Sequence, residues 1–152
     1  MMIQGIELRP LKRNCDERGF LMEVLRTDFD IFRKFTMVYI SKNYQGVIRA
    51  WHYHKLQDDI FCCVSGMVKA ACYDAREGSP TRGEVNEFLL GDDNPALLKI
   101  PVGVYHGYKT VGTQPSLLLN FPTERYNHKE PDEYRAPWND PAIPYSWDIV
   151  FK

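Results

Sequence analysis

The chain has 152 residues, of which 44% are hydrophobic and 26% are charged, the size and composition of one ordinary globular domain. Nineteen basic and twenty acidic side chains leave a formal net charge of −1, so we expect no general electrostatic attraction to nucleic acid or anionic lipid. No apolar run approaches the roughly 20 residues of a membrane-spanning helix, and the first residues lack the basic and apolar regions of a secretory signal. Composition therefore predicts a cytoplasmic protein with a single domain over residues 1–152, whose partners are neither nucleic acid nor membrane.

Short apolar stretches of strand length alternate with turn-like segments, and ten Gly and ten Pro disfavour long helices. In chain order the predicted strands are Phe20–Leu25, Met37–Ile40, Ile60–Val64, Met67–Tyr73, Glu87–Leu90, Leu97–Ile100 and Leu117–Phe121. Between the first two, Phe29, Phe32 and Phe35 recur every third residue and predict a short helix over Asp28–Lys34. Strands at this spacing are typical of an antiparallel β-sandwich or barrel. We expect the Pro-, Tyr- and Trp-rich end, about 122–152, to wrap the surface irregularly.

The four cysteines, Cys15, Cys62, Cys63 and Cys72, form no pattern typical of a disulfide framework or a zinc site. Two of them are neighbours in the chain, and no two are separated by two residues. Without an export signal, we expect them to be reduced and to act as small core side chains.

The polar residues that carry chemistry gather in two short stretches. His52 and His54 are two residues apart, so on a strand both side chains point to the same face. The stretch from Gly46 to Gly66 is similar to the cupin pattern G-x5-H-x-H-x4-E-x6-G, with Asp59 at the acidic position. Pro101–His106 matches the second cupin pattern, P-x-G-x-x-H. Cupins are small jelly-roll β-barrels whose interior holds a metal or a ligand, so the resemblance implies this fold.

The flanking segments carry a closer resemblance. The chain resembles the dTDP-4-dehydrorhamnose 3,5-epimerases from about residue 10 to about residue 148, and five motifs occur in the family's order. The matching segments are Asp16–Glu23, Ile48–Tyr53, Asp74–Thr81, Ile100–Tyr108 and Trp138–Pro141. The resemblance implies an isomerase of nucleotide-sugar and polysaccharide biosynthesis, which acts without a cofactor and forms a homodimer by exchanging N-terminal strands.

The family's substrate is a nucleotide-linked 4-keto-6-deoxy sugar, whose carbons next to the ketone are inverted by removing and returning a proton. A proton beside a carbonyl can be removed by a positioned base when the enolate oxygen meets a cation or hydrogen-bond donors. The resemblance assigns the base to His52 and places Tyr126 in the catalytic pocket. It assigns the diphosphate to Arg18 and Arg49, whose forked guanidinium groups suit phosphate. The other residues that it implies at the substrate are Glu23, Asn43, His106 and Glu133.

Several positions depart from the family pattern. Asp59 stands where the family has a lysine that helps to hold the enolate, and His54 stands where it has glutamine. Asn120 occupies the position of the family's catalytic acid, a tyrosine. The acidic residue that supports the family's base lies in a segment beyond position 152. We retain His54, Asp59 and Asn120 as substrate-binding candidates, and the proton donor stays open among other tyrosines of the pocket motifs, Tyr53, Tyr105 and Tyr108.

The same departures support other functions. His52, His54, Asp59 and His106 form a set of three histidines and one carboxylate that suits Zn²⁺, Mn²⁺, Fe²⁺ or Ni²⁺. A metal on His52 would occupy its lone pair and exclude it as the base. Related sugar-nucleotide 3,4-ketoisomerases carry H-x-H at this place without metal, so an activity of that kind is a second alternative. A third is a homologue that binds a sugar nucleotide without converting it. Metal-free epimerisation is the main prediction.

Overall fold

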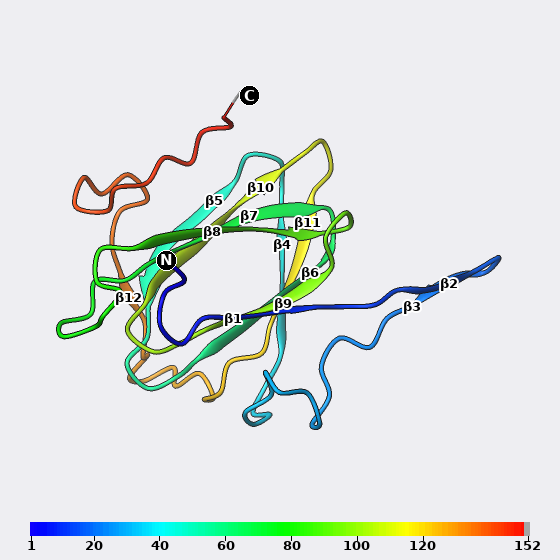
Figure 1. Ribbon diagram of the computed structural model, residues 1–152, viewed down its shortest axis with the longest axis horizontal. Helices are drawn as coiled ribbons and strands as arrows, with labels where there is room; N and C mark the ends of the chain where they lie inside the picture. Colours follow the sequence, from blue (N-terminus) through cyan, green and yellow to red (C-terminus); the bar gives the residue numbers. More distant parts are fainter. Residues whose placement is uncertain (151–152) are drawn as a thin grey trace.

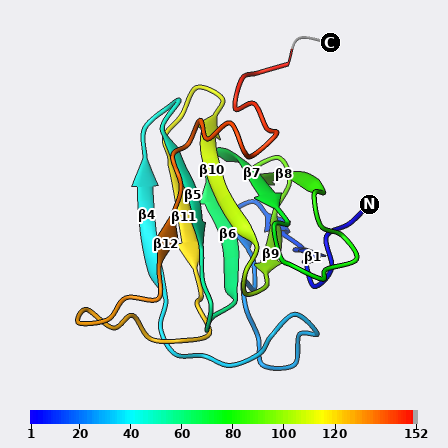
Figure 2. The same ribbon diagram turned by 90° about the vertical axis from the view of Figure 1, so that its left-hand side faces the viewer.

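The computed structural model describes residues 1–150, and its core is two antiparallel sheets of five strands that face each other (Figures 1 and 2). The first sheet contains, in spatial order, β1 (Glu7–Pro10), β9 (Ala96–Ile100), β6 (Asp59–Ser65), β11 (Ser116–Asn120) and β4 (Tyr39–Asn43). The second contains β12 (Tyr134–Arg135), β5 (Ile48–Tyr53), β10 (Tyr105–Val111), β7 (Met67–Tyr73) and β8 (Val85–Gly91). A separate hairpin pairs β2 (Asn14–Asp16) with β3 (Gly19–Leu21). The prediction of an all-β fold is confirmed.

The apolar run of β6 is buried on both of its faces. Phe61 and Cys63 point into the core between the sheets, whereas Ile60 and Cys62 point to the outer face. The segment before β4 covers that outer face, with Ile31 among its buried residues. A strand covered on both sides loses the usual alternation of apolar and polar residues, which explains the continuous run in the sequence.

The C-terminal segment covers the outer face of the second sheet. Trp51 of β5 and Ala71 of β7 pack there against Ile143 and Trp147. The segment from 122 onward is irregular except for β12, and residues 151–152 at its end lie outside the described part of the chain. Space for a ligand lies where β4, β5 and β12 come together, since residues of these three strands line a cavity.

The predicted helix over Asp28–Lys34 was wrong. The segment contains turns, in which the amide nitrogen of Phe32 donates to the carbonyl of Phe29 at 3.0 Å. Tertiary contacts decide its course, because Ile31 is buried under the first sheet and the guanidinium of Arg9 lies 3.9 Å from the centre of the Phe29 ring. Tertiary packing of these side chains therefore outweighs the helical spacing of the phenylalanines in the sequence. Within residues 1–150 there is no helix of the length and apolar character that crossing a membrane requires.

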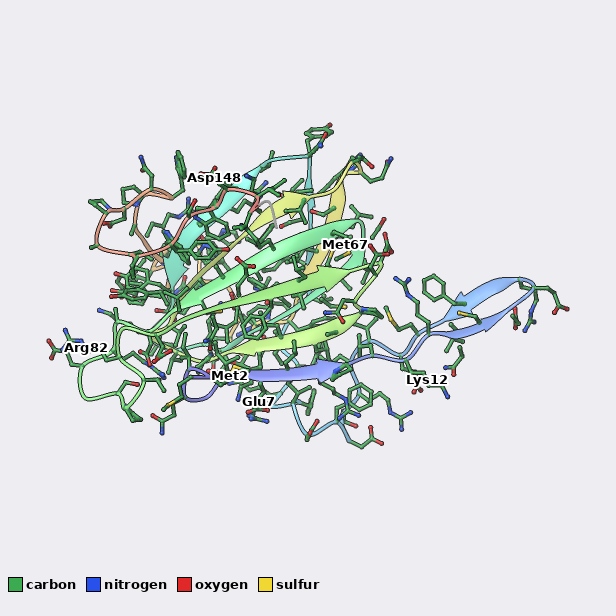
Figure 3. All side chains as sticks on the ribbon, turned by 45° about the horizontal axis from the view of Figure 1, so that its top comes forward. Met2, Glu7, Lys12, Met67, Arg82 and Asp148 are labelled. Carbon is green, nitrogen blue, oxygen red and sulfur yellow. The ribbon has the colours of Figure 1, made fainter. Side chains whose placement is uncertain are left out.

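The β2–β3 hairpin stands clear of the two sheets (Figures 1 and 3), and Lys12 marks the start of the projecting segment in Figure 3. It replaces the longer strand predicted over Phe20–Leu25, of which only the first two residues are in β3. Its Cys15 is exposed, contrary to the expectation of four core cysteines, whereas the other three, Cys62, Cys63 and Cys72, are buried. All four are free, and burial raises the pKa of Cys62 to about 12.

Candidate active site

Two cavities lie side by side at the open edge between the sheets and share part of their walls. The larger has a volume of about 690 Å³ and the smaller about 370 Å³, both within the size range of small-molecule sites. Tyr39, His52 and Glu133 line both cavities. His54 and Tyr126 line the larger one. The two spaces therefore form one site with His52 where they meet.

The predicted histidine cluster forms at this junction. His52 of β5 is the register partner of His106 of β10, and their ring centres are 4.4 Å apart. His54 follows β5 directly, and Asp59 begins β6 on the opposite sheet. One donor atom from each of the four residues lies within 4.8 Å of all the others. The sequence prediction that these four side chains meet is thus confirmed in the geometry.

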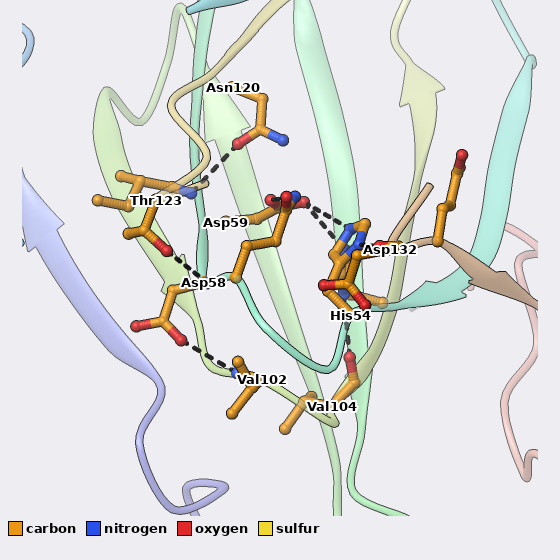
Figure 4. Close-up of polar contacts among 12 residues, drawn as sticks. His54, Asp58, Asp59, Val102, Val104, Asn120, Thr123 and Asp132 are labelled. Atoms are coloured by element: carbon orange, nitrogen blue, oxygen red, sulfur yellow. Dashed lines mark hydrogen bonds and ion pairs between the residues drawn. The ribbon is translucent and has the colours of Figure 1, made fainter. Parts of the chain in front are cut away.

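Hydrogen bonds fix the orientation of two of these rings (Figure 4). The Nε2 atoms of His54 and His106 lie 3.3 Å and 3.2 Å from the same oxygen, Oδ2 of Asp59. The Nδ1 atoms face backbone carbonyls, of Asp132 for His54 and of Val104 at 3.0 Å for His106. Each ring thus has an oxygen acceptor at both of its nitrogens. A neutral imidazole can donate to only one of them, so the arrangement is satisfied by a second ring proton or by a cation near Nε2.

Asp59 and His54 stabilise each other's charged form. Burial alone would raise the pKa of Asp59, but hydrogen bonds with His106 and His54 hold it well below its usual value. Burial would likewise lower the pKa of His54, yet its hydrogen bond to Asp59 and the carboxylate charge raise it. Asp59 is therefore an anion at neutral pH, hydrogen-bonded to both rings, and the raised pKa of His54 favours the charged form of that ring.

His52 differs from its two neighbours. Within residues 1–150 no group forms a hydrogen bond with the His52 ring. Its unpartnered nitrogens keep some exposed surface and are not completely buried. Burial, together with the nearby His106, lowers the pKa of His52 well below its ordinary value of about 6.5. The ring is neutral at neutral pH, with a lone pair available to the cavity. Such a group can act as a base.

A close approach of two strands holds His52 against the cluster. A side chain at Gly107 of β10 would place its Cβ 2.3 Å from the Cβ of Ala50 and 2.7 Å from the carbonyl oxygen of Arg49. Only glycine allows β10 to lie this close to β5. The glycine after His106 in the sequence motif therefore sets the spacing between the strands that carry His52 and His106.

Arg49 lines the smaller cavity, and Asn43 positions it. Asn43 is buried, accepts a hydrogen bond from Nε of Arg49 and donates one to the Tyr108 hydroxyl at 3.1 Å. Arg135 of β12 lines the same cavity. Two guanidinium groups at one cavity make it suited to a phosphate-bearing ligand.

Two of the predicted site residues lie away from the cavities. Arg18 is on the projecting hairpin, paired with Asp16, and Glu23 follows that hairpin and pairs with Arg26. Neither lines the two cavities of this chain. Asn120 is fully buried and, like Asn43, Asp59 and His106, does not itself line a cavity.

Sequence reasoning missed Tyr39. This residue lines both cavities, and its hydroxyl accepts a hydrogen bond of 2.8 Å from the Nδ2 atom of Asn120. It stands directly opposite Asn120 in the β4–β11 pair. The alternation of Tyr39, Ser41 and Asn43 along β4 was the available signal, because residues two apart share the inner face.

Two facing antiparallel sheets with a histidine-lined cavity between them define the chain as a cupin-type jelly roll. The solved structure of a dTDP sugar isomerase from Desulfovibrio desulfuricans G20 superposes with a TM-score of 0.89 at 33% identity, over 95% of this chain and 92% of that one. The family model described as dTDP-4-dehydrorhamnose 3,5-epimerase matches residues 1–152. The chain belongs to this family.

Two relatives match over nearly their full length. The spore coat polysaccharide biosynthesis protein SpsL of Bacillus subtilis is 42% identical over 151 residues, which cover 99% of this chain and 100% of SpsL. The probable low-salt glycan biosynthesis epimerase Agl13 of Haloferax volcanii is 45% identical over 148 residues, which cover 96% of this chain and 95% of Agl13. The predicted fold, family and isomerase class are confirmed.

Proposed function

We propose that this chain inverts a carbon next to the ketone of a nucleotide-linked 4-keto-6-deoxyhexose, with His52 as the base. The observation that carries the proposal is a neutral imidazole, without a hydrogen-bond partner among residues 1–150, at the junction of two cavities. Membership of the epimerase family and relatives named for polysaccharide and glycan biosynthesis support the same reaction.

The chemistry follows from the protonation states. His52 takes the proton beside the carbonyl, and the electron pair moves to the ketone oxygen to give an enolate. His54 lines the larger cavity, and its raised pKa favours the cationic ring, so positive charge lies near the developing enolate. This charge takes the place of the family lysine whose position is occupied by Asp59. Proton return from the opposite face inverts the carbon.

The nucleotide diphosphate belongs in the smaller cavity beside Arg49 and Arg135, and the sugar in the larger cavity beside Tyr126 and Glu133. Bidentate contacts of arginine with phosphate supply much of the binding free energy of such ligands. His52 at the junction of the cavities is then next to the sugar carbons, while the diphosphate leads away from it.

The decisive experiment is incubation of the protein with a dTDP-4-keto-6-deoxyhexose in heavy water, followed by NMR. The proposal predicts deuterium at C3 or C5 and inversion of that carbon. Deuterium uptake with a ketone moved to C3 would indicate a 3,4-ketoisomerase instead. Binding without deuterium uptake would show a non-catalytic sugar-nucleotide-binding protein.

The projecting hairpin supports a homodimer in which the site is completed by the partner subunit. The hairpin, which stands clear of the sheets (Figure 3), exposes Phe20 and Leu21 and carries Arg18, which reaches neither cavity of its own chain. Apolar side chains on an exposed arm suit contact with a second copy. Light scattering should give twice the monomer mass, and a monomer would contradict the assembly. The four unpaired thiols suit a reducing compartment such as the cytoplasm.

A second candidate function is that of a metal-dependent cupin. The observation in its favour is the set of His52, His54, Asp59 and His106, whose donor atoms gather within 4.8 Å. Three imidazoles and a carboxylate fit a divalent transition metal, and the Nδ1 contacts of His54 and His106 with carbonyls are typical of metal-binding histidines. Elemental analysis of the purified protein decides between the candidates. One metal ion per chain would favour this function and exclude His52 as the base.

A further inference from the structure

Inversion of a carbon needs a proton donor on the side of the sugar opposite the base. His52 belongs to β5 in one sheet, so the donor must approach the cavities from the other sheet. Tyr39 of β4 does so, and it lines both of the cavities that His52 lines. We infer that Tyr39 is the catalytic residue that donates the proton to the carbon, an inference that rests on the proposed function.

The hydrogen bonds of Asn120 leave the proton of Tyr39 free for this role. The Oδ1 atom of Asn120 accepts from the backbone nitrogen of Ile60 at 3.2 Å, so its Nδ2 group must face Tyr39. Nδ2 donates to the hydroxyl oxygen, which means that the hydroxyl's own proton is not used in this contact. When that proton leaves, the same donor stabilises the phenolate oxygen.

The position of the hydroxyl places it beside the histidine cluster. Its partner Asn120 bonds to Ile60, the residue that directly follows Asp59 in β6. A carboxylate oxygen of Asp59 in turn lies within 4.8 Å of a ring nitrogen of His52. Tyr39 and His52 therefore lie on either side of Asp59 in this chain of contacts and line the same two cavities from strands of opposite sheets.

The protonation states of the two residues suit their roles at one pH. Burial, with a contribution from the charge of Asp59, raises the pKa of Tyr39 to about 12, so the phenol keeps its proton at neutral pH. The environment of His52 keeps its imidazole neutral under the same conditions. Pairs of groups whose environments separate their pKa values in this way are typical of acid–base catalysis.

The other tyrosines are less suited. Tyr108 lies on β10, in the same sheet as His52, and its hydroxyl accepts from Asn43. Tyr53 and Tyr105 line neither cavity, and Tyr126 lines only the larger one. Asn120 occupies the family position of the catalytic tyrosine, and through its hydrogen bond it positions a tyrosine from the neighbouring strand.

The proton balance is simple. The C–H bond breaks as the N–H bond of the His52 imidazolium forms, and the O–H bond of Tyr39 breaks as the new C–H bond forms on the other face. Afterwards the imidazolium gives its proton to water and the phenolate takes one from water. Without the Tyr39 hydroxyl, the imidazolium can still exchange its proton for deuterium from heavy water and return the deuterium to the enolate on the original face, with the original configuration.

This difference defines the test. In heavy water, Tyr39→Phe should still place deuterium on the carbon at a rate close to that of the wild type, while inversion falls by about 100-fold or more. Tyr44→Phe is the matched control, because Tyr44 is 68% exposed, directly follows β4 and lines neither cavity. It should exchange and invert like the wild type. Equal unfolding temperatures would show that the variants are folded.

Two results would overturn the assignment. Unchanged inversion by Tyr39→Phe would show that another group donates the proton. Loss of both exchange and inversion in the folded variant would place Tyr39 in proton removal rather than proton return. A wild-type protein that neither exchanges nor inverts would instead remove the proposed function, and the role of Tyr39 with it.

Discussion

Two histidines with the same ordinary pKa, His52 and His54, acquire different protonation behaviour within one site. His54 shares Asp59 with His106, and the hydrogen bond to this carboxylate favours its charged form. His52 has burial and neighbouring imidazoles but no carboxylate bonded to its ring, so its neutral form is favoured. The division of roles is set by one carboxylate, at a position where the family has a lysine.

The lowered pKa of His52 makes a prediction about pH dependence. The base acts only when neutral, so kcat/KM should fall on the acid side with a midpoint below about 6.5, the ordinary value for histidine. Asp59 stays ionised over this range because its pKa is held well below its usual value. A pH–rate profile measures the midpoint, and a midpoint at or above that value would contradict the environment assigned to His52.

Replacing the shared carboxylate should affect both stability and titration. In Asp59→Asn the buried His54 loses the anion that raises its pKa, so that pKa should fall, as measured by NMR titration of the ring. Removing one partner of a buried pair costs about 3–5 kcal/mol. A histidine whose pKa is higher in the folded than in the unfolded state adds stability at pH values below its unfolded-state pKa. This contribution is lost as the pH rises through the folded-state pKa. Urea unfolding should therefore show the largest loss from this group in mildly acidic solution.

The adjacent residue provides the control. Asp58 accepts a hydrogen bond from the backbone nitrogen of Val102 at 3.1 Å and has no contact with the histidines. Asp58→Asn should leave the pKa of His54 unchanged and cost about 1 kcal/mol. Equal titration of His54 in the wild type and in Asp59→Asn would show that the carboxylate does not set its charge.

At the scale of strands, the sequence predicted the strands that carry the motifs better than it predicted which strands pair with one another. The spacing of His52 and His54 was enough to place both rings on one face. The role of Tyr39 depends on its pairing with Asn120, which is 81 residues away in the chain, and no local pattern contains that contact. The helix over Asp28–Lys34 failed for the same reason, since burial of Ile31 under the first sheet outweighs the local phenylalanine spacing.

The close approach of β5 and β10 also makes a prediction. In Gly107→Ala the new methyl group meets the Cβ of Ala50 and the carbonyl of Arg49, which forces the strands apart and moves His52 from His106. Overpacking of this kind costs about 1–3 kcal/mol, measured by urea unfolding, and activity should fall with it. Adding Ala50→Gly removes the nearest of the three obstructing atoms, the Cβ of Ala50, and should restore part of the lost stability. No loss in the single variant would contradict the packing.

At the scale of the molecule, two sheets supply opposite walls of one site. The jelly roll, the β-strand content and the histidine cluster could be predicted from motifs, because these residues lie close in sequence or match a family pattern. The location of Arg18 could not, because it sits on a hairpin that leaves the body of its own chain. Its predicted role at the diphosphate requires the proposed dimer, in which we expect this arm to reach the site of the partner subunit.

The central claim is that the unbound, uncharged ring of residue 52 removes a proton from carbon, and His52→Ala tests it most directly. We predict that this variant binds the dTDP-linked sugar with nearly unchanged affinity by calorimetry, because Arg49 and Arg135 remain in the smaller cavity. In heavy water its deuterium uptake, followed by NMR, should fall by about 100-fold or more. Deuterium uptake equal to that of the wild type would contradict the account.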